Sequence, residues 1–188
     1  ADAHRLKSER SAPPLDAGGK LRIIYFLGSA LHKPDDSRIT LLLADEAGTG
    51  EFAARLATIL KPGMVVYLRG DLGAGKTMLV RALLRALGFA GSVKSPTYTL
   101  LEQYRIGGLH FCHFDLYRFR DESEWEAAGF RDEFDGRNIC LVEWPEQAHG
   151  LLPEADLEIR FEILPAGRNI TLNANTAIAG ECLKLLQD

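Results

Sequence analysis

Short apolar runs, each bounded by turn-forming residues, divide much of the chain into predicted strands. Three such runs are rich in branched aliphatic side chains, which favour a buried strand over a helix at this length. They lie at residues 39–43, 64–69 and 138–142, and the second follows directly after a Pro-Gly pair that marks a turn. We interpret these segments as the buried strands of one sheet.

Two further pairs of runs have the spacing of β-hairpins. Residues 100–104 and 109–114 flank two consecutive glycines, and residues 156–163 and 169–173 flank a Pro-Ala-Gly sequence. In the second pair apolar and polar residues alternate, which predicts one buried face. The sheet is therefore expected to contain antiparallel hairpins beside parallel strands.

Helices are predicted where apolar residues recur three or four positions apart. Asp45 is a suitable N-cap for a helix that ends near residue 60, and a second helix over 78–87 ends at a glycine. A third is predicted over 121–130, with Trp125 and Ala128 directed inward, and a fourth over 176–186. Strands alternating with helices predict an α/β fold with a mixed parallel and antiparallel sheet flanked by helices.

The beginning of the chain has a different composition from the rest. Residues 1–20 are rich in charge, proline and glycine, which is typical of a flexible segment. We interpret residues 1–37 as a largely flexible N-terminal extension and residues 38–188 as one folded domain, the usual arrangement for a chain of 188 residues.

Charge and cysteine content narrow the function classes. The net charge of −4 argues against a broad basic face for nucleic acid. Cys112, Cys140 and Cys182 are far apart and suggest neither a zinc site nor a disulfide framework. Cys112 and Cys140 lie inside apolar runs and are expected to be buried thiols, which fits a reducing cytoplasm. The apolar run at residues 23–27 is too short to cross a membrane.

The most informative stretch of the sequence follows the predicted strand at 64–69. Gly70 to Thr77 reads Gly-Asp-Leu-Gly-Ala-Gly-Lys-Thr and matches the phosphate-binding P-loop pattern, placed between a strand and a helix as that motif requires. Glycines let backbone N–H groups surround an anion, and the helix start directs its positive dipole end at the phosphates. Lys76 is expected to contact the β- and γ-phosphates of a nucleoside triphosphate, and the Thr77 hydroxyl to bind Mg²⁺. The fold is therefore predicted to be a single P-loop NTPase-like α/β domain.

Two carboxylates are candidates to complete this site. Asp115 and Glu143 each follow an apolar strand, and ligands of α/β sheets bind beyond the carboxyl ends of the strands. Mg²⁺ requires oxygen ligands, which suggests Asp115 as a support for the metal. Glu143 is suited to orient or deprotonate an attacking water. The alternatives are that Asp115 caps the next turn and that Glu143 is solvated in a loop.

Other residues near these motifs have less certain roles. Thr97 and Tyr98 lie in a polar loop that is either a γ-phosphate-sensing loop or an ordinary turn. Trp144 is expected either to stack on a base, to anchor a partner or to join the core. We treat His113 as structural, and for Arg118 we favour an ion pair with Glu122 or Glu124 over contact with phosphate.

Four motifs taken together resemble those of the TsaE (YjeE) family of small bacterial ATPases. They are the P-loop at 70–77, Ser-Pro-Thr-Tyr-Thr-Leu at 95–100, His-Phe-Asp-Leu-Tyr-Arg at 113–118 and Val-Glu-Trp-Pro-Glu at 142–146. The likeness covers roughly residues 39–175. The N-terminal extension departs from the compact family pattern.

The resemblance implies a function that the residues alone do not reveal. The family takes part in forming threonylcarbamoyladenosine beside the anticodon of tRNAs that read codons beginning with A. It acts with the TsaD–TsaB heterodimer, so contact with tRNA is expected to be indirect, and ATP hydrolysis is expected to reset that complex. The implied catalytic residues are Lys76 and Glu143, and the implied metal ligands are Thr77, Asp115 and Glu143. The expected ATP-binding set is Asp71, Leu72, Gly73, Ala74, Gly75, Lys76, Thr77, Met78, Thr97 and Trp144.

Three other functions are compatible with a P-loop. A small-molecule kinase is the main alternative, but the arginine-rich lid typical of that class is not evident in the sequence. A GTPase is disfavoured because the guanine-reading Asn-Lys-x-Asp motif is absent. A pure nucleotide-dependent binding module is the third. We expect a Mg²⁺-dependent ATPase whose activity is low without its partner, because no arginine finger is evident.

Overall fold

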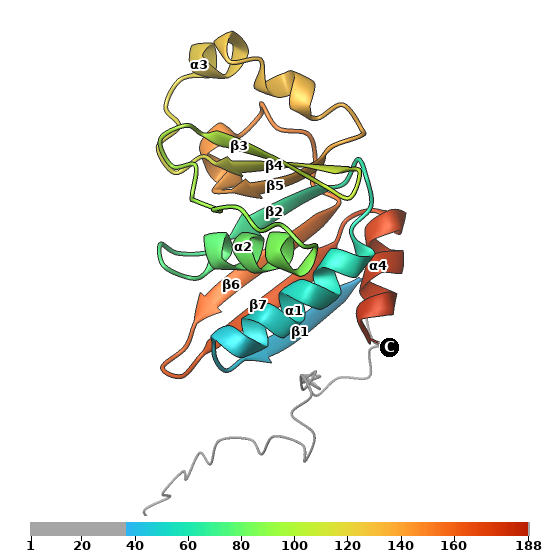
Figure 1. Cartoon of the computed structure of the whole chain (residues 1–188). Helices are drawn as coiled ribbons and strands as arrows, with labels where there is room; N and C mark the ends of the chain where they lie inside the picture. Colours follow the sequence, from blue (N-terminus) through green and yellow to red (C-terminus); the bar gives the residue numbers. More distant parts are fainter. Residues whose placement is uncertain (1–36, 188) are drawn as a thin grey trace, which may run out of the picture.

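The computed structural model describes residues 37–187, so the predicted extension lies almost entirely outside the described residues. Figure 1 shows one sheet with helices packed against it. The elements in chain order are β1 (Arg38–Leu43), α1 (Glu46–Ile59), β2 (Val65–Arg69), α2 (Lys76–Ala86), β3 (Leu101–Ile106), β4 (Leu109–Asp115), α3 (Glu122–Ala127), the 3-10 helix η1 (Phe130–Glu133), β5 (Ile139–Glu143), the 3-10 helix η2 (Pro145–Ala148), β6 (Leu157–Ile163), β7 (Arg168–Ala174) and α4 (Ala177–Gln187).

The described strands form one seven-stranded mixed sheet in the order β1-β7-β6-β2-β5-β4-β3. Its four central strands, β6, β2, β5 and β4, are parallel to one another. The two predicted hairpins, β3–β4 and β6–β7, are antiparallel and extend the sheet on either side, and β1 pairs antiparallel with β7. The predicted α/β fold with a mixed sheet is therefore confirmed.

Successive side chains of each strand point to opposite faces of the sheet, and each face is covered by a separate hydrophobic core. On one face, side chains such as Val66, Phe111 and Leu141 pack under α1, α2 and α4. On the other, Phe114 and Val142 pack with Trp125 and the aromatic residues around α3. Successive side chains of a strand point to opposite faces, so a residue two positions after Phe111 or Leu141 lies on the α2 face. This rule decides where the candidate site residues lie.

The helices follow the predictions with one correction. Asp45 caps α1, as predicted, by accepting a hydrogen bond of 2.8 Å from the Gly48 N–H. The third helix ends at Ala127, earlier than predicted, and Ala128 is exposed instead of inward. Gly129 has a φ of +69° and turns the chain, so that Phe130 takes the second buried position beside Trp125.

The apolar run at residues 23–27 lies outside the described residues, and two further findings concern residues 37–187. Within residues 37–187 no helix is long and apolar enough to cross a membrane. Cys112, Cys140 and Cys182 are free thiols with buried side chains, as predicted for the first two.

Candidate active site

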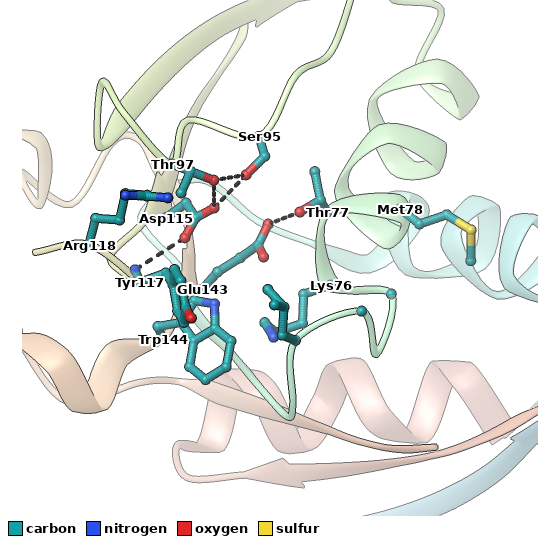
Figure 2. A pocket seen from close by; sticks show the side chains of 13 residues that line it. Lys76, Thr77, Met78, Ser95, Thr97, Asp115, Tyr117, Arg118, Glu143 and Trp144 are labelled. Carbon is teal, nitrogen blue, oxygen red and sulfur yellow. Dashed lines mark hydrogen bonds between the residues drawn. The ribbon is translucent and has the colours of Figure 1, made fainter. Parts of the chain in front are cut away.

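A cavity of about 440 Å³ opens where β2, β4 and β5 end and α2 begins. Figure 2 shows the side chains that line it, which come from four separate stretches of the sequence. The lining residues are Leu72, Gly73, Gly75, Lys76, Thr77, Met78, Ser95, Thr97, Asp115, Tyr117, Arg118, Glu143 and Trp144.

Strand alternation brings the two predicted carboxylates to this cavity. Asp115 lies four residues after Phe111 and Glu143 lies two after Leu141, so both point to the α2 face of the sheet. They are also direct partners in the parallel register of β4 and β5. Two acids that are 28 positions apart in sequence are therefore neighbours at one edge of the cavity.

The glycine-rich loop turns sharply between β2 and α2. Gly75 caps α2 with a φ of +105°, a left-handed conformation that a side chain disfavours. The Nζ of Lys76 donates hydrogen bonds to the carbonyl oxygens of Gly70, at 2.6 Å, and Asp71, at 2.9 Å. Lys76 thus closes the loop on itself and holds its ammonium group inside the curve of the loop.

The pKa of Lys76 is lowered by its surroundings. Burial of the side chain lowers its pKa below the ordinary lysine value, whereas the nearby carboxylates of Glu143 and Asp115 act in the opposite direction. The ammonium also lies 3.9 Å from the centre of the Trp144 ring, within cation–π distance. A bound anion would compensate the positive charge of the Lys76 ammonium more fully than its contact with the Trp144 ring does.

Glu143 is held by two donors at one carboxylate oxygen. Its Oε1 accepts a hydrogen bond of 2.8 Å from Thr77 Oγ1 and lies 2.8 Å from Nε2 of His113. Among the described residues no donor reaches Oε2, the other oxygen of the carboxylate. One oxygen thus fixes the orientation of the group and the other remains for a ligand or a water molecule.

Asp115 is engaged by the polar loop before β3. Its Oδ2 accepts hydrogen bonds from the hydroxyls of Ser95 and Thr97, the latter at 2.6 Å. Its Oδ1 accepts a hydrogen bond of 3.2 Å from the Tyr117 N–H. The carboxylate therefore fastens the 95–97 segment to the end of β4.

Trp144 and Arg118 border the cavity. Trp144 is half-buried, has a φ of +58° and packs against Tyr117 with ring centres 5.0 Å apart. The expected ion pair of Arg118 with Glu122 or Glu124 is wrong. The guanidinium instead lies 4.8 Å from the centre of the Tyr98 ring and lines the cavity.

The predicted nucleotide-binding residues fall into two groups. Most of them line the cavity, including Met78 and Thr97. Asp71 and Ala74 do not: Asp71 points to solvent and contributes its carbonyl oxygen to Lys76, and the Ala74 side chain joins the core. The contribution of these two residues to the site is made by backbone atoms.

Sequence reasoning missed three side chains that contact this site. Ser95 lies two positions before Thr97 in the same polar loop, which was the available signal. His113 was treated as structural, yet it lies on the cavity face two residues before Asp115 and contacts Glu143. Arg168 donates a hydrogen bond of 3.0 Å to Ala74 O, and no local sequence signal links residues 94 positions apart.

The oxygen atoms at the cavity fit a hard cation. Thr77 Oγ1 and the Glu143 carboxylate lie 2.8 Å apart, and Asp115 pairs with Glu143 across the strands. Within residues 37–187 no three His, Cys, Asp or Glu residues form a metal cage. This combination fits Mg²⁺, which takes one or two protein oxygens and completes its shell with water and phosphate oxygens.

Comparison with known proteins gives concordant matches. A family model described as "Threonylcarbamoyl adenosine biosynthesis protein TsaE" matches residues 43–170. The tRNA threonylcarbamoyladenosine biosynthesis protein TsaE of Haemophilus influenzae is 46% identical over 143 residues, which are 73% of this chain and 90% of that protein. The protein of the same description from Bacillus subtilis is 41% identical over 111 residues, 59% of this chain and 69% of that one.

A solved structure matches as well. The crystal structure of YdiB from Bacillus subtilis superposes with a TM-score of 0.64 at 30% sequence identity. The superposition covers 80% of this chain and 95% of that chain.

Proposed function

The chain belongs to the TsaE family of threonylcarbamoyladenosine biosynthesis proteins, and on that premise we propose that it binds and hydrolyses ATP with Mg²⁺ in support of tRNA modification. One observation carries the proposal. Lys76, Thr77 and Glu143, from the loop after β2 and the end of β5, converge on one cavity at the start of α2. This is the arrangement that a triphosphate and its metal require.

Each part of the loop has a distinct task in nucleotide binding. The backbone N–H groups of the loop and the N-terminus of α2 are suited to receive the phosphate oxygens. Lys76 would exchange its bonds to the Gly70 and Asp71 carbonyls for phosphate oxygens, which compensate its charge better. Trp144 lies directly beside Lys76 and would cover the phosphate tail from solvent.

Thr77 and Glu143 are the residues that would hold Mg²⁺, with Asp115 as a neighbouring support. When bound, Mg²⁺ neutralises negative charge that develops on the phosphate oxygens. Asp115 has a second task, because its contacts with Ser95 and Thr97 couple the polar loop to the site. A loop fastened in this way is suited to respond to the γ-phosphate.

We assign the hydrolytic step to Glu143. Its Oε1 is fixed by Thr77 and His113, and its Oε2 is available to orient a water molecule and accept a proton from it. The carboxylate is buried, which excludes bulk water from around it.

Slow hydrolysis in isolation and stimulation by the TsaD–TsaB heterodimer complete the proposal. Leu72 lines the cavity and is 69% exposed, and Tyr98, which packs on the cavity residue Arg118, is 84% exposed. A partner that docks beside the nucleotide site would cover these two exposed residues. With a net charge of −4, the chain is expected to reach tRNA only through that partner.

A reconstituted tRNA-modification assay with purified TsaD–TsaB tests the proposed function. We expect multiple turnovers only when this chain, ATP and Mg²⁺ are all present, with release of free phosphate. Glu143→Gln keeps the shape of the side chain and is expected to retain ATP binding and to lose hydrolysis by about 10²–10⁴-fold. Phosphate transfer to a small acceptor would instead indicate a kinase, and wild-type hydrolysis in Glu143→Gln would refute the role of Glu143.

A further inference from the structure

Arg168 reaches the glycine-rich loop from a distant part of the sheet. It is the first residue of β7, and its backbone pairs with Leu43 of β1 on one side and Ile163 of β6 on the other. From this doubly paired position its Nη1 donates a hydrogen bond of 3.0 Å to Ala74 O. The backbone of Arg168 is therefore held on both sides by the sheet, and its guanidinium contacts the loop.

The guanidinium occupies the space that a side chain at position 75 would fill. A Cβ placed on Gly75 would lie 1.7 Å from Nη1 of Arg168. Glycine at this position thus has two consequences: it permits the φ of +105°, and it leaves room for Arg168 against the backbone.

The bond to Ala74 O determines the direction of the next N–H group. Within residues 37–187 no peptide bond is cis, so the carbonyl of Ala74 and the N–H of Gly75 point in opposite directions within one peptide plane. By holding this carbonyl, Arg168 also fixes the direction of the Gly75 N–H, which points the opposite way. Among the described residues this N–H donates no hydrogen bond, so it remains available to an anion.

Among the described residues Arg168 forms no ion pair with a carboxylate, and its guanidinium donates to Ala74 O instead. A cation bonded to a carbonyl polarises the peptide and strengthens the N–H on the other side as a donor. The charge also adds to the positive end of the α2 dipole.

We propose that Arg168 is a positioning residue for nucleotide binding, which orients and polarises the Ala74–Gly75 peptide so that its N–H receives a phosphate oxygen. This inference rests on the proposed nucleotide binding and adds to it a residue outside the cavity lining. Arg168 acts through the peptide without touching the nucleotide.

The test compares Arg168→Met with Arg168→Lys and a matched control. Arg105→Met removes the same charge from β3, the strand at the opposite edge of the sheet. We would measure the Kd for ATP and for ADP by calorimetry at two salt concentrations, the Tm without nucleotide, and the amide resonance of Gly75 by NMR. The loss of a charge-assisted hydrogen bond predicts roughly ten-fold weaker binding of both nucleotides to Arg168→Met.

The expected pattern separates positioning from general stabilisation. Arg168→Met should shift the Gly75 amide resonance in the nucleotide-free protein and weaken binding, with a Tm close to that of wild type. Arg168→Lys should restore part of the affinity, and Arg105→Met should change neither property. Should Arg168→Met fold poorly, Arg168→Lys and its Gly75 resonance decide the same question.

Two outcomes would overturn the inference or its premise, and they differ. If wild type binds ATP and the Arg168 variants bind it equally well, or if the Gly75 resonance does not move, Arg168 has no positioning role. If wild type itself binds no nucleotide, the proposed function fails instead.

Discussion

Nε2 of His113 lies 2.8 Å from Oε1 of Glu143, inside the layer between the sheet and α2. His113 is fully buried, and its other ring nitrogen, Nδ1, has no hydrogen-bond partner among the described residues. The imidazole is therefore dedicated to one contact, in which Nε2–H donates to the carboxylate. Together with Thr77 it fixes Oε1 of Glu143 and leaves Oε2 without a donor among the described residues.

Replacing His113 should separate hydrolysis from binding. His113→Leu leaves Oε1 of Glu143 with one donor in a buried position, which is expected to cost about 1–3 kcal/mol of unfolding free energy. We expect a lower kcat for ATP hydrolysis with a change of less than about three-fold in nucleotide affinity, since no phosphate contact is lost. Urea unfolding and steady-state kinetics measure the two effects.

His113→Gln is the matched control, because its amide can donate to the same oxygen. It should retain more of the stability and of kcat than His113→Leu does. Equal kinetics in wild type and His113→Leu would mean that Glu143 is oriented without the imidazole.

Lys76→Met should weaken ATP binding by roughly 10–100-fold, which corresponds to the loss of about 1.5–3 kcal/mol from a charged hydrogen bond. Methionine keeps much of the apolar stem that lies beside Trp144. Lys61→Met provides the control, since Lys61 pairs with Glu181 on the surface and lies away from the cavity. Calorimetric titration measures both variants, and unchanged affinity in Lys76→Met would contradict the assigned phosphate contact.

The hydroxyls of Ser95 and Thr97 should control the order of the loop before β3. The double variant Ser95→Ala, Thr97→Val removes both side-chain hydrogen bonds to Asp115 Oδ2. We expect faster hydrogen exchange over residues 93–100 and slower ATP hydrolysis. Thr97→Ser keeps a hydroxyl and should behave like wild type, whereas an unchanged exchange rate in the double variant would show that Asp115 does not fasten the loop.

Tyr67 makes stability depend on pH in the alkaline range. Burial raises its pKa to about 12, a shift that the nearby charge of Arg69 opposes, and its hydroxyl donates to Pro153 O. Above the ordinary tyrosine pKa of about 10 the unfolded chain loses this proton first, so the folded state binds more protons and its stability falls as pH rises from about 10 to 12.

Removing the hydroxyl should remove that part of the pH dependence. Tyr67→Phe is expected to lose less stability than wild type between pH 10 and about 12, as measured by urea unfolding at several pH values. Tyr98→Phe alters an exposed phenol and should leave the slope unchanged. An alkaline absorbance titration in which Tyr67 ionises near pH 10 would contradict the raised pKa.

Local patterns predicted most of the secondary structure because the relevant physics acts over a few residues. The N-cap of α1 at Asp45, the Gly107–Gly108 hairpin and the strand–loop–helix order around Lys76 all depend on near neighbours in the chain. Two predictions were wrong. The turn at Gly129 places Phe130, and not Ala128, in the buried position, and Arg118 packs on Tyr98 instead of pairing with an acid of α3.

The sequence alone determined the loop motif, the two carboxylates at strand ends and the family resemblance, because each is written in a short run of residue types. The tertiary structure decided which side chains meet. Strand register made Asp115 and Glu143 neighbours, and strand alternation turned His113 toward Glu143. Only β6 lies between β7 and β2 in the sheet, so Arg168 at the start of β7 can reach Ala74 in the loop after β2. Such contacts depend on how distant strands pair, and no local run of residues encodes that pairing.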